Sequence, residues 1–317
     1  MTDKISQINN INMRLPKVRG IIRKNFELSR LSWLKVGGPA EIFFQPEDED
    51  DLSFFLKNLE TNIPVFVIGA CSNLIIRDGG IPGVVIKLGK NFSTIKLNKT
   101  VVSVGAACRD SYLAQTCAKE GVDLSFLRTI PGNLGGAVKM NAGCYGSYLS
   151  DYLIGLTLIR RDGSITEMKA SDFKFSYRSS NIPDDAIITN VLLRKELDDP
   201  LRIEMKMTRA LDIRNLSQPT KDLSCGSTFR NPLGRSSLED KYDSDHSLKA
   251  WKLIDDAGLR GAKIGGAMVS KKHTNFLINT GNATAKDIED LGKFVIEKVK
   301  TNSGINLIWE VKRVGKY

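Results

Sequence analysis

A cluster of glycines is the part of this sequence whose residue types and spacing most clearly allow chemistry. The segment from Ile130 to Gly146 reads IPGNLGGAVKMNAGCYG. Because glycine lacks a Cβ, closely spaced glycines let backbone N–H groups approach a ligand, and a concave row of such donors suits a phosphate or pyrophosphate. The alternative is that these glycines only serve tight turns and close packing. Our first hypothesis is an anionic cofactor.

The two familiar phosphate-binding motifs are absent. Gly-Gly pairs recur at residues 37–38, 79–80 and 265–266, but no two glycines are separated by a single residue. This spacing excludes the G-x-G-x-x-G fingerprint, and no G-x-x-x-x-G-K-[ST] string is present either. A nucleotide would therefore be held by another scaffold.

Three polar residues stand in unusual surroundings: Arg178 in SYRSS, Ser227 in CGSTFRNP and Glu310 in a final apolar strand. Each also has an ordinary structural explanation, as a surface salt-bridge partner, a turn residue and a water-facing strand residue. The only histidines, His246 and His273, lie beside no nucleophile motif. We expect His273 to pack or bind rather than to act as a base.

The composition is that of a globular protein of two or three domains, with 317 residues, 41% hydrophobic and 26% charged. No apolar run approaches the roughly 18 residues of a membrane span, and the N-terminus is too polar for a signal peptide. The five cysteines are scattered, without a C-x-x-C pair. We expect reduced thiols, no metal, no membrane association and a cytoplasmic location.

The formal charge of +10 allows either nucleic-acid binding or the steering of small anions. Lysine and arginine are dispersed along the chain, without a basic run of five or a recognisable nucleic-acid motif. This dispersion favours small anions, so we expect no nucleic acid. No exposed apolar seam is evident, and we expect a monomer.

Alternating helix and strand patterns must position these residues. The first part is expected to contain a helix after Pro46 and strands from Pro64 to Gly89. The middle part is expected to contain β-type segments at 92–97 and 101–104, a helix at 109–120, a hairpin with a type I′ turn at Asp162-Gly163, a strand at 186–194 and a helix at 200–216. A boundary is expected at Gln218-Pro219. Helices at 247–257 and 284–300 follow, and a last strand, 305–314, is expected to return to the middle sheet.

From about Phe26 onward the chain resembles the UDP-N-acetylenolpyruvoylglucosamine reductase family. Seven motifs in order carry the resemblance: KVGGPAE (35–41), GACSNLIIRDGG (69–80), IPGNLGGAVKMNAGCYG, YRSS (177–180), CGSTFRNP (225–232), LIDDAGLRGAKIGGAMVSKKHTNF (253–276) and WEVKRVG (309–315). The family implies an α+β fold, with two FAD-binding subdomains of the vanillyl-alcohol-oxidase (PCMH) type and a C-terminal α+β substrate-binding domain that closes over a UDP-sugar. The corresponding ranges are 1–88, 89–217 completed by 303–317, and 218–302.

The resemblance also implies a cofactor site for FAD. The residues that match its positions lie in two glycine motifs: Gly69, Ala70, Cys71, Ser72, Asn73, Pro131, Gly132, Gly135, Gly136, Met140, Asn141 and Gly143. Cys71 departs from the glycine usual in the family, so its side chain either loosens FAD or points away. NADPH would reduce the flavin and leave the cleft.

The reaction implied by the family is hydride transfer from flavin N5 to C3 of UDP-N-acetylglucosamine enolpyruvate, giving UDP-N-acetylmuramate for peptidoglycan synthesis. Arg178 would stabilise the charge that develops on the carboxylate, a protonated Glu310 would hydrogen-bond the same group, and Ser227 would give its proton to C2. Four further residues match substrate contacts: Tyr177, Arg214, Asn231 and Asn275. The short segment after Arg178 resembles the shorter type of this enzyme, which lacks a tyrosine-bearing lid.

Two alternatives remain open at this point. A related FAD-dependent oxidoreductase acting on another small molecule would share the pyrophosphate loops without needing Ser227 and Glu310. A non-catalytic basic module that binds anions or nucleic acid would be colourless and would take up no FAD.

Overall fold

The N-terminal layer of the molecule is a mixed four-stranded sheet. In the computed structural model, which describes residues 15–144, 146–232 and 248–317, its strand order is β1 (Ile21–Glu27), β2 (Pro39–Gln45), β5 (Ile81–Lys87) and β3 (Val65–Ile68). β1 is antiparallel to β2, whereas β2 and β3 are both parallel to β5. The helix α1 (Glu49–Asn58) connects β2 to β3, and Asp48 caps it by accepting from the Asp51 N–H.

The middle layer is a five-stranded antiparallel sheet. Its order is β11 (Ile165–Lys169), β10 (Leu153–Ile159), β14 (Ile187–Arg194), β7 (Val101–Gly105) and β6 (Ile95–Leu97). The predicted hairpin, formed by β10 and β11, is confirmed, but the prediction of a type I′ turn is wrong. Asp162 does not have a positive φ while Gly163 has φ 81°, and the Gly163 N–H donates to Arg160 O, as in a longer loop whose glycine forms the bulge.

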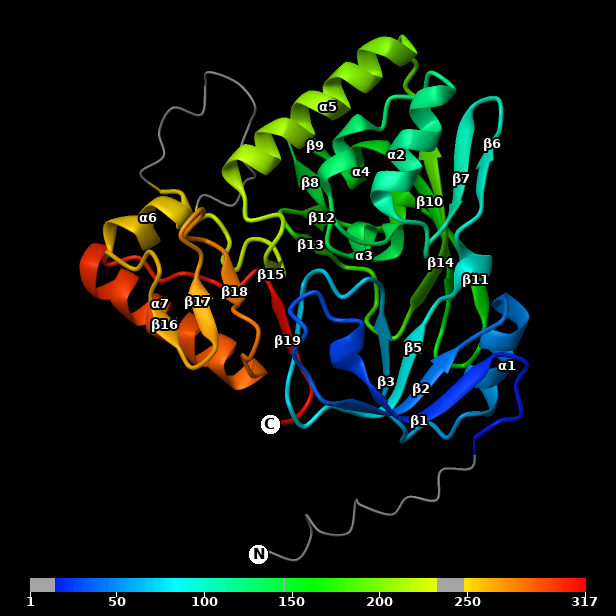
Figure 1. Ribbon diagram of the computed structural model, residues 1–317. Helices are drawn as coiled ribbons and strands as arrows, with labels where there is room; N and C mark the ends of the chain where they lie inside the picture. Colours follow the sequence, from blue (N-terminus) through cyan, green and yellow to red (C-terminus); the bar gives the residue numbers. More distant parts are fainter. Residues whose placement is uncertain (1–14, 145, 233–247) are drawn as a thin grey trace, which may run out of the picture.

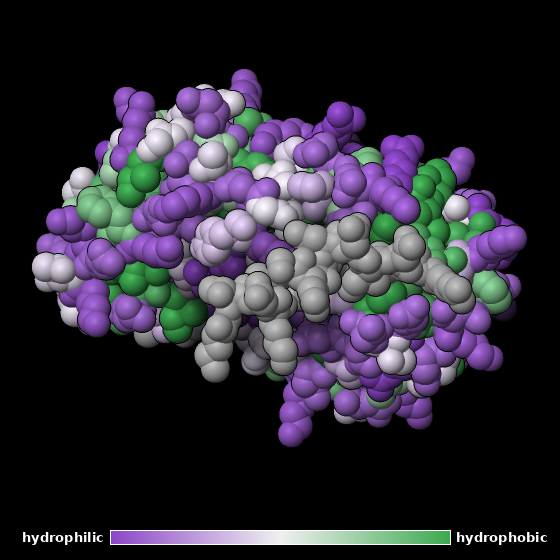
Figure 2. Space-filling view, turned by 90° about the horizontal axis from the view of Figure 1, so that it is seen from below, coloured by the Kyte–Doolittle hydropathy of each residue, from purple (hydrophilic) through white to green (hydrophobic). Residues whose placement is uncertain are grey.

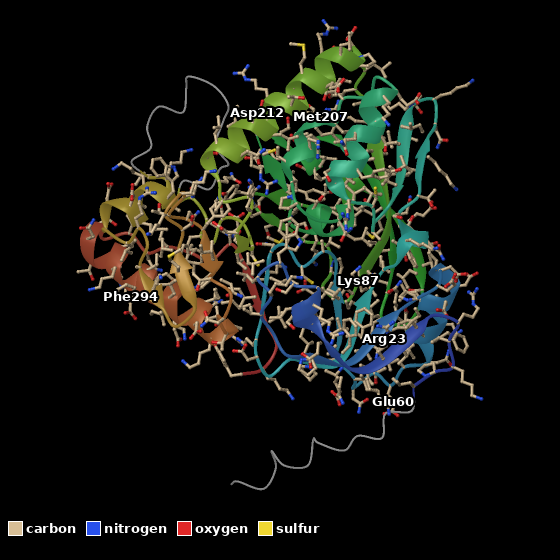
Figure 3. The ribbon with its side chains drawn as sticks, viewed as in Figure 1. Arg23, Glu60, Lys87, Met207, Asp212 and Phe294 are labelled. Carbon is tan, nitrogen blue, oxygen red and sulfur yellow. The ribbon has the colours of Figure 1, made fainter. Side chains whose placement is uncertain are left out.

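Short helices cover the middle sheet: α2 (Asp110–Lys119), α3 (Leu134–Lys139), α4 (Leu149–Tyr152), α5 (Pro200–Ser217) and the 3₁₀ turn η4 (Ser125–Thr129). α5 runs across the top of the view in Figure 1, with Met207 buried against this layer and Asp212 exposed (Figure 3). Side chains of the first two sheets contribute to one shared core that includes Phe44 and Val104. The N-terminal and middle layers are therefore packed together.

The C-terminal part has its own sheet and core. Its strand order is β15 (Leu223–Ser224), β18 (Leu277–Asn279), β17 (Ala267–Val269) and β16 (Lys263–Ile264), all antiparallel. α6 (Ala250–Asp256) and α7 (Ala285–Ser303) pack with this sheet (Figure 1). The predicted capping pair, Thr284 and Asp287, begins α7 as a capping box. The predicted start of the preceding helix, Ser247, lies outside the described residues.

Four more strands form two small hairpins: β8 (Gly143–Cys144) with β9 (Ser147–Tyr148), and β12 (Phe175–Ser176) with β13 (Ser179–Ser180). Single-turn 3₁₀ helices occur as η2 (Leu28–Arg30), η3 (Lys90–Phe92) and η5 (Ala170–Asp172). The prediction of a strand from residue 92 is therefore corrected, because strand β6 begins only after η3.

The last segment of the chain differs from the prediction. The regular strand β19 is only Lys312–Val314, and it pairs in parallel with β4 (Leu74–Ile76) rather than with the middle sheet. An isolated bridge joins Trp309 to Phe229. The prediction that this segment completes the middle sheet is wrong, because its partners come from the N-terminal part and from the C-terminal domain.

In the described residues, no helix is both long and apolar enough to cross a membrane. The face shown in Figure 2 is predominantly hydrophilic, with small separated hydrophobic areas.

Candidate active site

Two loops from different sheets meet beside α3. The Ser72 hydroxyl donates to Pro131 O at 2.8 Å, and a Cβ added at Gly132, whose φ is 140°, would lie 3.1 Å from Ser72 Oγ. A Cβ at Gly69 would lie 3.1 Å from Asn133 Oδ1. The structure therefore brings the two predicted cofactor motifs together. Where they approach each other, a side chain at Gly69 or Gly132 would be crowded by the other loop.

Gly135 and Gly136 have different roles in the second loop. The Gly135 N–H donates to Ala106 O at 2.9 Å, and a Cβ there would lie 3.0 Å from Ala106 Cβ, so this glycine serves packing. Gly136 is exposed, and no atom lies within 4 Å of an added Cβ. Space on that side lets a ligand approach the backbone closely, so the loop fits the pyrophosphate of FAD.

The first loop also contains a strained residue. Cys71 has φ 54°, a region that favours glycine, which explains why glycine is usual there. Its side chain is 3% exposed and packs in a core cluster with Leu28 and Ile76, where burial raises the pKa of the thiol to about 11. The thiol therefore points into the core, while Ala70 before it is half-buried.

Asn73 connects this loop to the C-terminal segment. Its side-chain N–H donates to Glu310 O at 3.4 Å, and its own carbonyl accepts from the Lys312 N–H at 3.1 Å. The cofactor loop and the segment that carries Glu310 are thus fixed to each other.

Two predicted cofactor residues hold the backbone instead. Asn141 is buried, accepts from the Ser150 N–H and donates to Ser176 O at 3.2 Å. A Cβ at Gly143 would lie 2.4 Å from Ser147 O. Met140, by contrast, lines the cavity described next.

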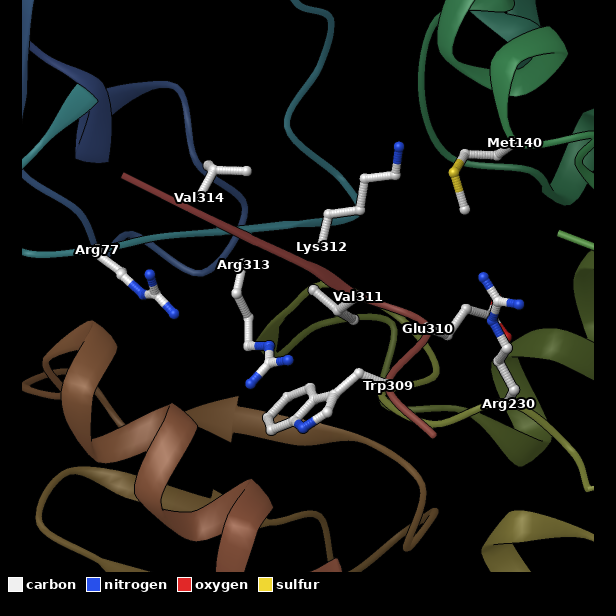
Figure 4. A pocket seen from close by; sticks show the side chains of 9 residues that line it. All are labelled: Arg77, Met140, Arg230, Trp309, Glu310, Val311, Lys312, Arg313 and Val314. Carbon is white, nitrogen blue, oxygen red and sulfur yellow. The ribbon is translucent and has the colours of Figure 1, made fainter. Parts of the chain in front are cut away.

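A cavity of about 330 Å³ lies where the C-terminal segment passes the end of α3 (Figure 4). Its lining includes Met140, Arg230, Glu310 and Lys312. The lining combines one carboxylate with several cationic side chains, so its chemistry suits an anionic ligand.

Arg178 is presented by the tight β12–β13 hairpin. It occupies the hairpin tip with φ 55°, an uncommon conformation for a residue other than glycine. Its Nε lies 2.9 Å from Glu310 Oε1, and the side chains are 17% and 14% exposed. Strain of this kind is often retained at functional sites, where the surrounding structure holds it.

Glu310 is held by the segment that carries Ser227. The Glu310 N–H donates to Thr228 O at 2.8 Å, and the Arg230 N–H donates to Ile308 O at 2.8 Å. Burial raises the pKa of the Glu310 carboxyl, while the charges of Arg178 and Arg230 oppose that rise. The three residues predicted to act together are therefore brought onto neighbouring segments.

Ser227 follows Gly226, which has φ 78°, and is half-buried. Within the part of the chain that the structure describes, its hydroxyl has no hydrogen-bond partner. This hydroxyl stands one residue before Thr228, whose carbonyl accepts from the Glu310 N–H, and a half-buried hydroxyl can donate a proton to a ligand.

The four predicted substrate contacts are placed differently. Tyr177 is half-buried next to Arg178, whose Cζ lies 5.0 Å from the ring centroid, and desolvation raises the pKa of its hydroxyl to about 12. Asn231 follows Arg230 and accepts from the Ala250 N–H at 3.2 Å. Tyr177 and Asn231 are thus the chain neighbours of Arg178 and Arg230.

Arg214 and Asn275 make contacts outside this group. Arg214 lies at the end of α5, where it donates to Thr129 O and Gln218 Oε1. Asn275 is 4% exposed, and its amide both donates to Phe229 O and accepts from the Phe229 N–H, each at 2.9 Å. In this structure Asn275 supports the loop that carries Ser227 and Arg230.

Our sequence reasoning missed Arg230 as a member of the site. It stands three positions after Ser227 in the same motif, and this spacing was the available signal. His273 packs with Phe276, at 4.8 Å between ring centroids, and burial lowers its pKa to about 4. His246 lies outside the described residues.

Comparison with known proteins agrees with this geometry. Residues 40–169 match the family described as an FAD binding domain, and residues 218–314 match the family described as UDP-N-acetylenolpyruvoylglucosamine reductase, C-terminal domain. The predicted α+β class with an FAD-binding part is confirmed, and the protein is an FAD-dependent oxidoreductase.

Whole-chain relatives define the family. The chain is 52% identical to a UDP-N-acetylenolpyruvoylglucosamine reductase of Paracoccus denitrificans, over 95% of this chain and 98% of the relative, and 50% identical to one of Roseobacter denitrificans, over 95% and 97%. A crystal structure of the reductase from Thermus caldophilus matches with TM-score 0.78 and 32% identity, over 94% and 99% of the two chains. This chain belongs to the UDP-N-acetylenolpyruvoylglucosamine reductase family.

Proposed function

We propose that this protein reduces the enolpyruvyl ether of UDP-N-acetylglucosamine to UDP-N-acetylmuramate for peptidoglycan synthesis, with FAD as cofactor and NADPH as reductant. The observation that carries the proposal is the Arg178–Glu310 pair, at 2.9 Å, next to the segment that bears Ser227. Membership of the family supports the substrate, and the joined glycine loops support the cofactor.

The residues that would hold FAD are those at the junction of the two loops. Gly136 offers an open approach to the backbone, and Gly69, Ser72 and Gly132 lie where the loops meet. The flavin, when bound, supplies the hydride that is added to C3 of the substrate. The proposed division into subdomains 1–88 and 89–217 and a domain 218–302 places these loops on the first two.

The side chains of the cavity act on the charge that this addition creates. Negative charge passes from C2 to the carboxylate, and a fixed guanidinium such as Arg178 stabilises it where it develops. Glu310 assists as a neutral hydrogen-bond donor, because burial raises its pKa and favours the protonated form. Ser227 donates its proton to C2, which is basic enough at that stage to accept a proton from a hydroxyl.

The remaining contacts in the proposal concern the UDP-sugar. Tyr177 and Asn231 adjoin Arg178 and Arg230 in the chain and are the stronger candidates. We retain Arg214 for the diphosphate or sugar, and Asn275 as an indirect contact that acts through the loop it supports. The enzyme is proposed to act in the cytoplasm as a monomer, without nucleic acid or membrane.

A two-stage flavin experiment tests the proposal. Under anaerobic conditions, NADPH should bleach the flavin absorbance of the native protein, and UDP-N-acetylglucosamine enolpyruvate should restore it. Ser227→Ala should bleach normally but recover about 10²- to 10⁴-fold more slowly, as expected for loss of a general acid. Normal recovery in Ser227→Ala would reject Ser227 as proton donor. Bleaching of the native protein without recovery would reject the substrate.

A further inference from the structure

Two buried guanidinium N–H groups in the described part of the chain have no hydrogen-bond partner. They are Arg178 Nη1 and Arg230 Nε, from the β12–β13 hairpin and the loop after β15. An unpaired buried donor on a charged group is unfavourable, because it loses its hydrogen bonds to water without replacement. Their occurrence on two adjacent arginines indicates an acceptor that belongs between them.

The two arginines are positioned as a pair. Arg230 Nη2 lies 3.5 Å from Arg178 O, and the Arg230 backbone is fixed by its bond to Ile308 O. Asn275 fixes the preceding residue, Phe229, on both its N–H and its carbonyl. In Figure 4 the Arg230 guanidinium lies beside Glu310 in the cavity. Arg230 is thus held in the cavity by a rigid backbone.

The charges around Glu310 leave an excess of positive charge. Arg178 and Arg230 face its carboxylate, Tyr177 is neutral with a pKa of about 12, and Lys312 adds a further cation to the lining. Only one hydrogen bond, from Arg178 Nε, reaches the Glu310 carboxylate from the described residues. The missing acceptor is therefore an anion, and planar guanidinium groups suit a carboxylate.

We propose that Arg230 is a second guanidinium that receives the substrate's enolpyruvyl carboxylate beside Arg178, and that Glu310 takes up a proton from solvent when this carboxylate binds. The inference rests on the proposed function and adds a binding residue to it. Proton uptake follows from electrostatics, because an incoming carboxylate repels the charge of Glu310 and competes for the same guanidinium groups. The substrate thereby creates the neutral acid that the reaction requires.

Ligands with and without the carboxylate-bearing lactyl group test the role of Arg230. The FAD-loaded protein would be titrated with UDP-N-acetylmuramate, which carries the carboxylate, and with UDP-N-acetylglucosamine, which lacks it, following the flavin absorbance. Arg230→Gln should weaken binding of the first about 10- to 100-fold, the size expected for a charge-assisted hydrogen bond, and leave the second unchanged. Equal weakening of both ligands would place Arg230 on the diphosphate and overturn the proposal.

Arg313→Gln provides a matched control. Arg313 lines the same cavity, but its guanidinium lies over the Trp309 ring at 4.7 Å. If it weakens UDP-N-acetylmuramate binding as much as Arg230→Gln does, the effect is one of overall charge and the proposal fails. Arg230→Lys keeps the positive charge but loses the planar guanidinium. If Arg230→Gln does not fold, Arg230→Lys should still weaken binding of UDP-N-acetylmuramate more than binding of UDP-N-acetylglucosamine.

Calorimetry tests the proton. Binding of UDP-N-acetylmuramate in buffers of different ionisation enthalpy should report uptake of about one proton by the native protein at a pH where Glu310 is ionised, and none by Glu310→Gln. Equal uptake in both proteins would overturn the assignment to Glu310. Failure of the native protein to bind either ligand would instead reject the proposed function.

Discussion

Two partly buried Arg–Glu pairs lie along the C-terminal segment, and their comparison separates structure from function. Arg77 Nε lies 2.8 Å from Glu289 Oε1, and Arg178 Nε lies 2.9 Å from Glu310 Oε1. Glu289 also accepts from Arg77 Nη2 at 3.3 Å and from the Tyr317 hydroxyl at 2.6 Å. Similar ion-pair distances therefore occur in very different hydrogen-bonding environments.

The two carboxyl groups respond oppositely to their surroundings. Burial raises the pKa of both, but hydrogen bonds from Arg77 and Tyr317 outweigh burial at Glu289 and lower its pKa. At Glu310 burial dominates and the pKa is raised. A saturated pair stabilises the fold, whereas a pair with unused donors in a cavity remains available to a ligand.

The saturated pair also fixes the C-terminal domain to the segment that follows β4. Arg77 follows β4, Glu289 lies on α7 and Tyr317 ends the chain. Asp78 adds to this connection by accepting from the Ala285 N–H at the start of α7.

The largest expected effect is on activity, from Glu310→Gln. A glutamine amide cannot share a proton with the reacting carboxylate, and loss of this stabilisation should slow flavin reoxidation by the enolpyruvyl substrate about 10²- to 10³-fold. The midpoint of urea unfolding should not fall, because a carboxyl with a raised pKa does not stabilise the fold in its ionised form. Rapid-mixing measurements of both half-reactions provide the check, and unchanged reoxidation would contradict the comparison.

Glu289→Gln should instead reduce stability. Removing the carboxylate leaves Arg77 without its partner, and the free energy of unfolding should fall by about 3 kcal/mol. The neighbouring Asp290→Asn is the matched control, since Asp290 pairs with Lys286 and Lys293 at the surface and should change stability by at most about 1 kcal/mol. Equal losses in urea titrations would remove the distinction between the two α7 carboxylates.

The pH dependence of stability should have opposite signs for the two pairs. The lowered pKa of Glu289 stabilises the fold above its ordinary value of 4.5, and this contribution is lost as pH falls through the folded-state pKa. The raised pKa of Glu310 stabilises the fold below 4.5, and this contribution is lost as pH rises through the folded-state pKa. The free energy of unfolding, measured from pH 3 to 7, should fall less on acidification in Glu289→Gln than in the native protein. In Glu310→Gln it should be higher near neutrality, relative to the native protein, than it is at pH 3.

Tyr317→Phe should give the smallest effect. It removes one hydrogen bond to Glu289 but leaves the Arg77 pair, so the expected loss is about 1 kcal/mol. Thermal unfolding measures it, and the cost should largely disappear when Glu289→Gln is already present. A full additive loss in the double variant would show that the hydroxyl acts elsewhere.

The sequence by itself determined the family, and its motifs predicted the cofactor loops and the roles of Arg178, Ser227 and Glu310. These features are local: short motifs and their order are readable without knowing which segments meet. Helix boundaries such as the Thr284–Asp287 cap are also local, because the hydrogen bonds that fix them join residues three positions apart.

Only the tertiary structure decided which segments pair and which donors remain unused. The final segment joins β4, because pairing depends on distant backbone edges that periodicity does not encode. Asn141 and Asn275 looked like ligand residues, yet each amide holds a neighbouring backbone. The different roles of Glu289 and Glu310 depend on side chains from several segments, because burial and the number of hydrogen-bond donors together set the charge of a carboxyl group.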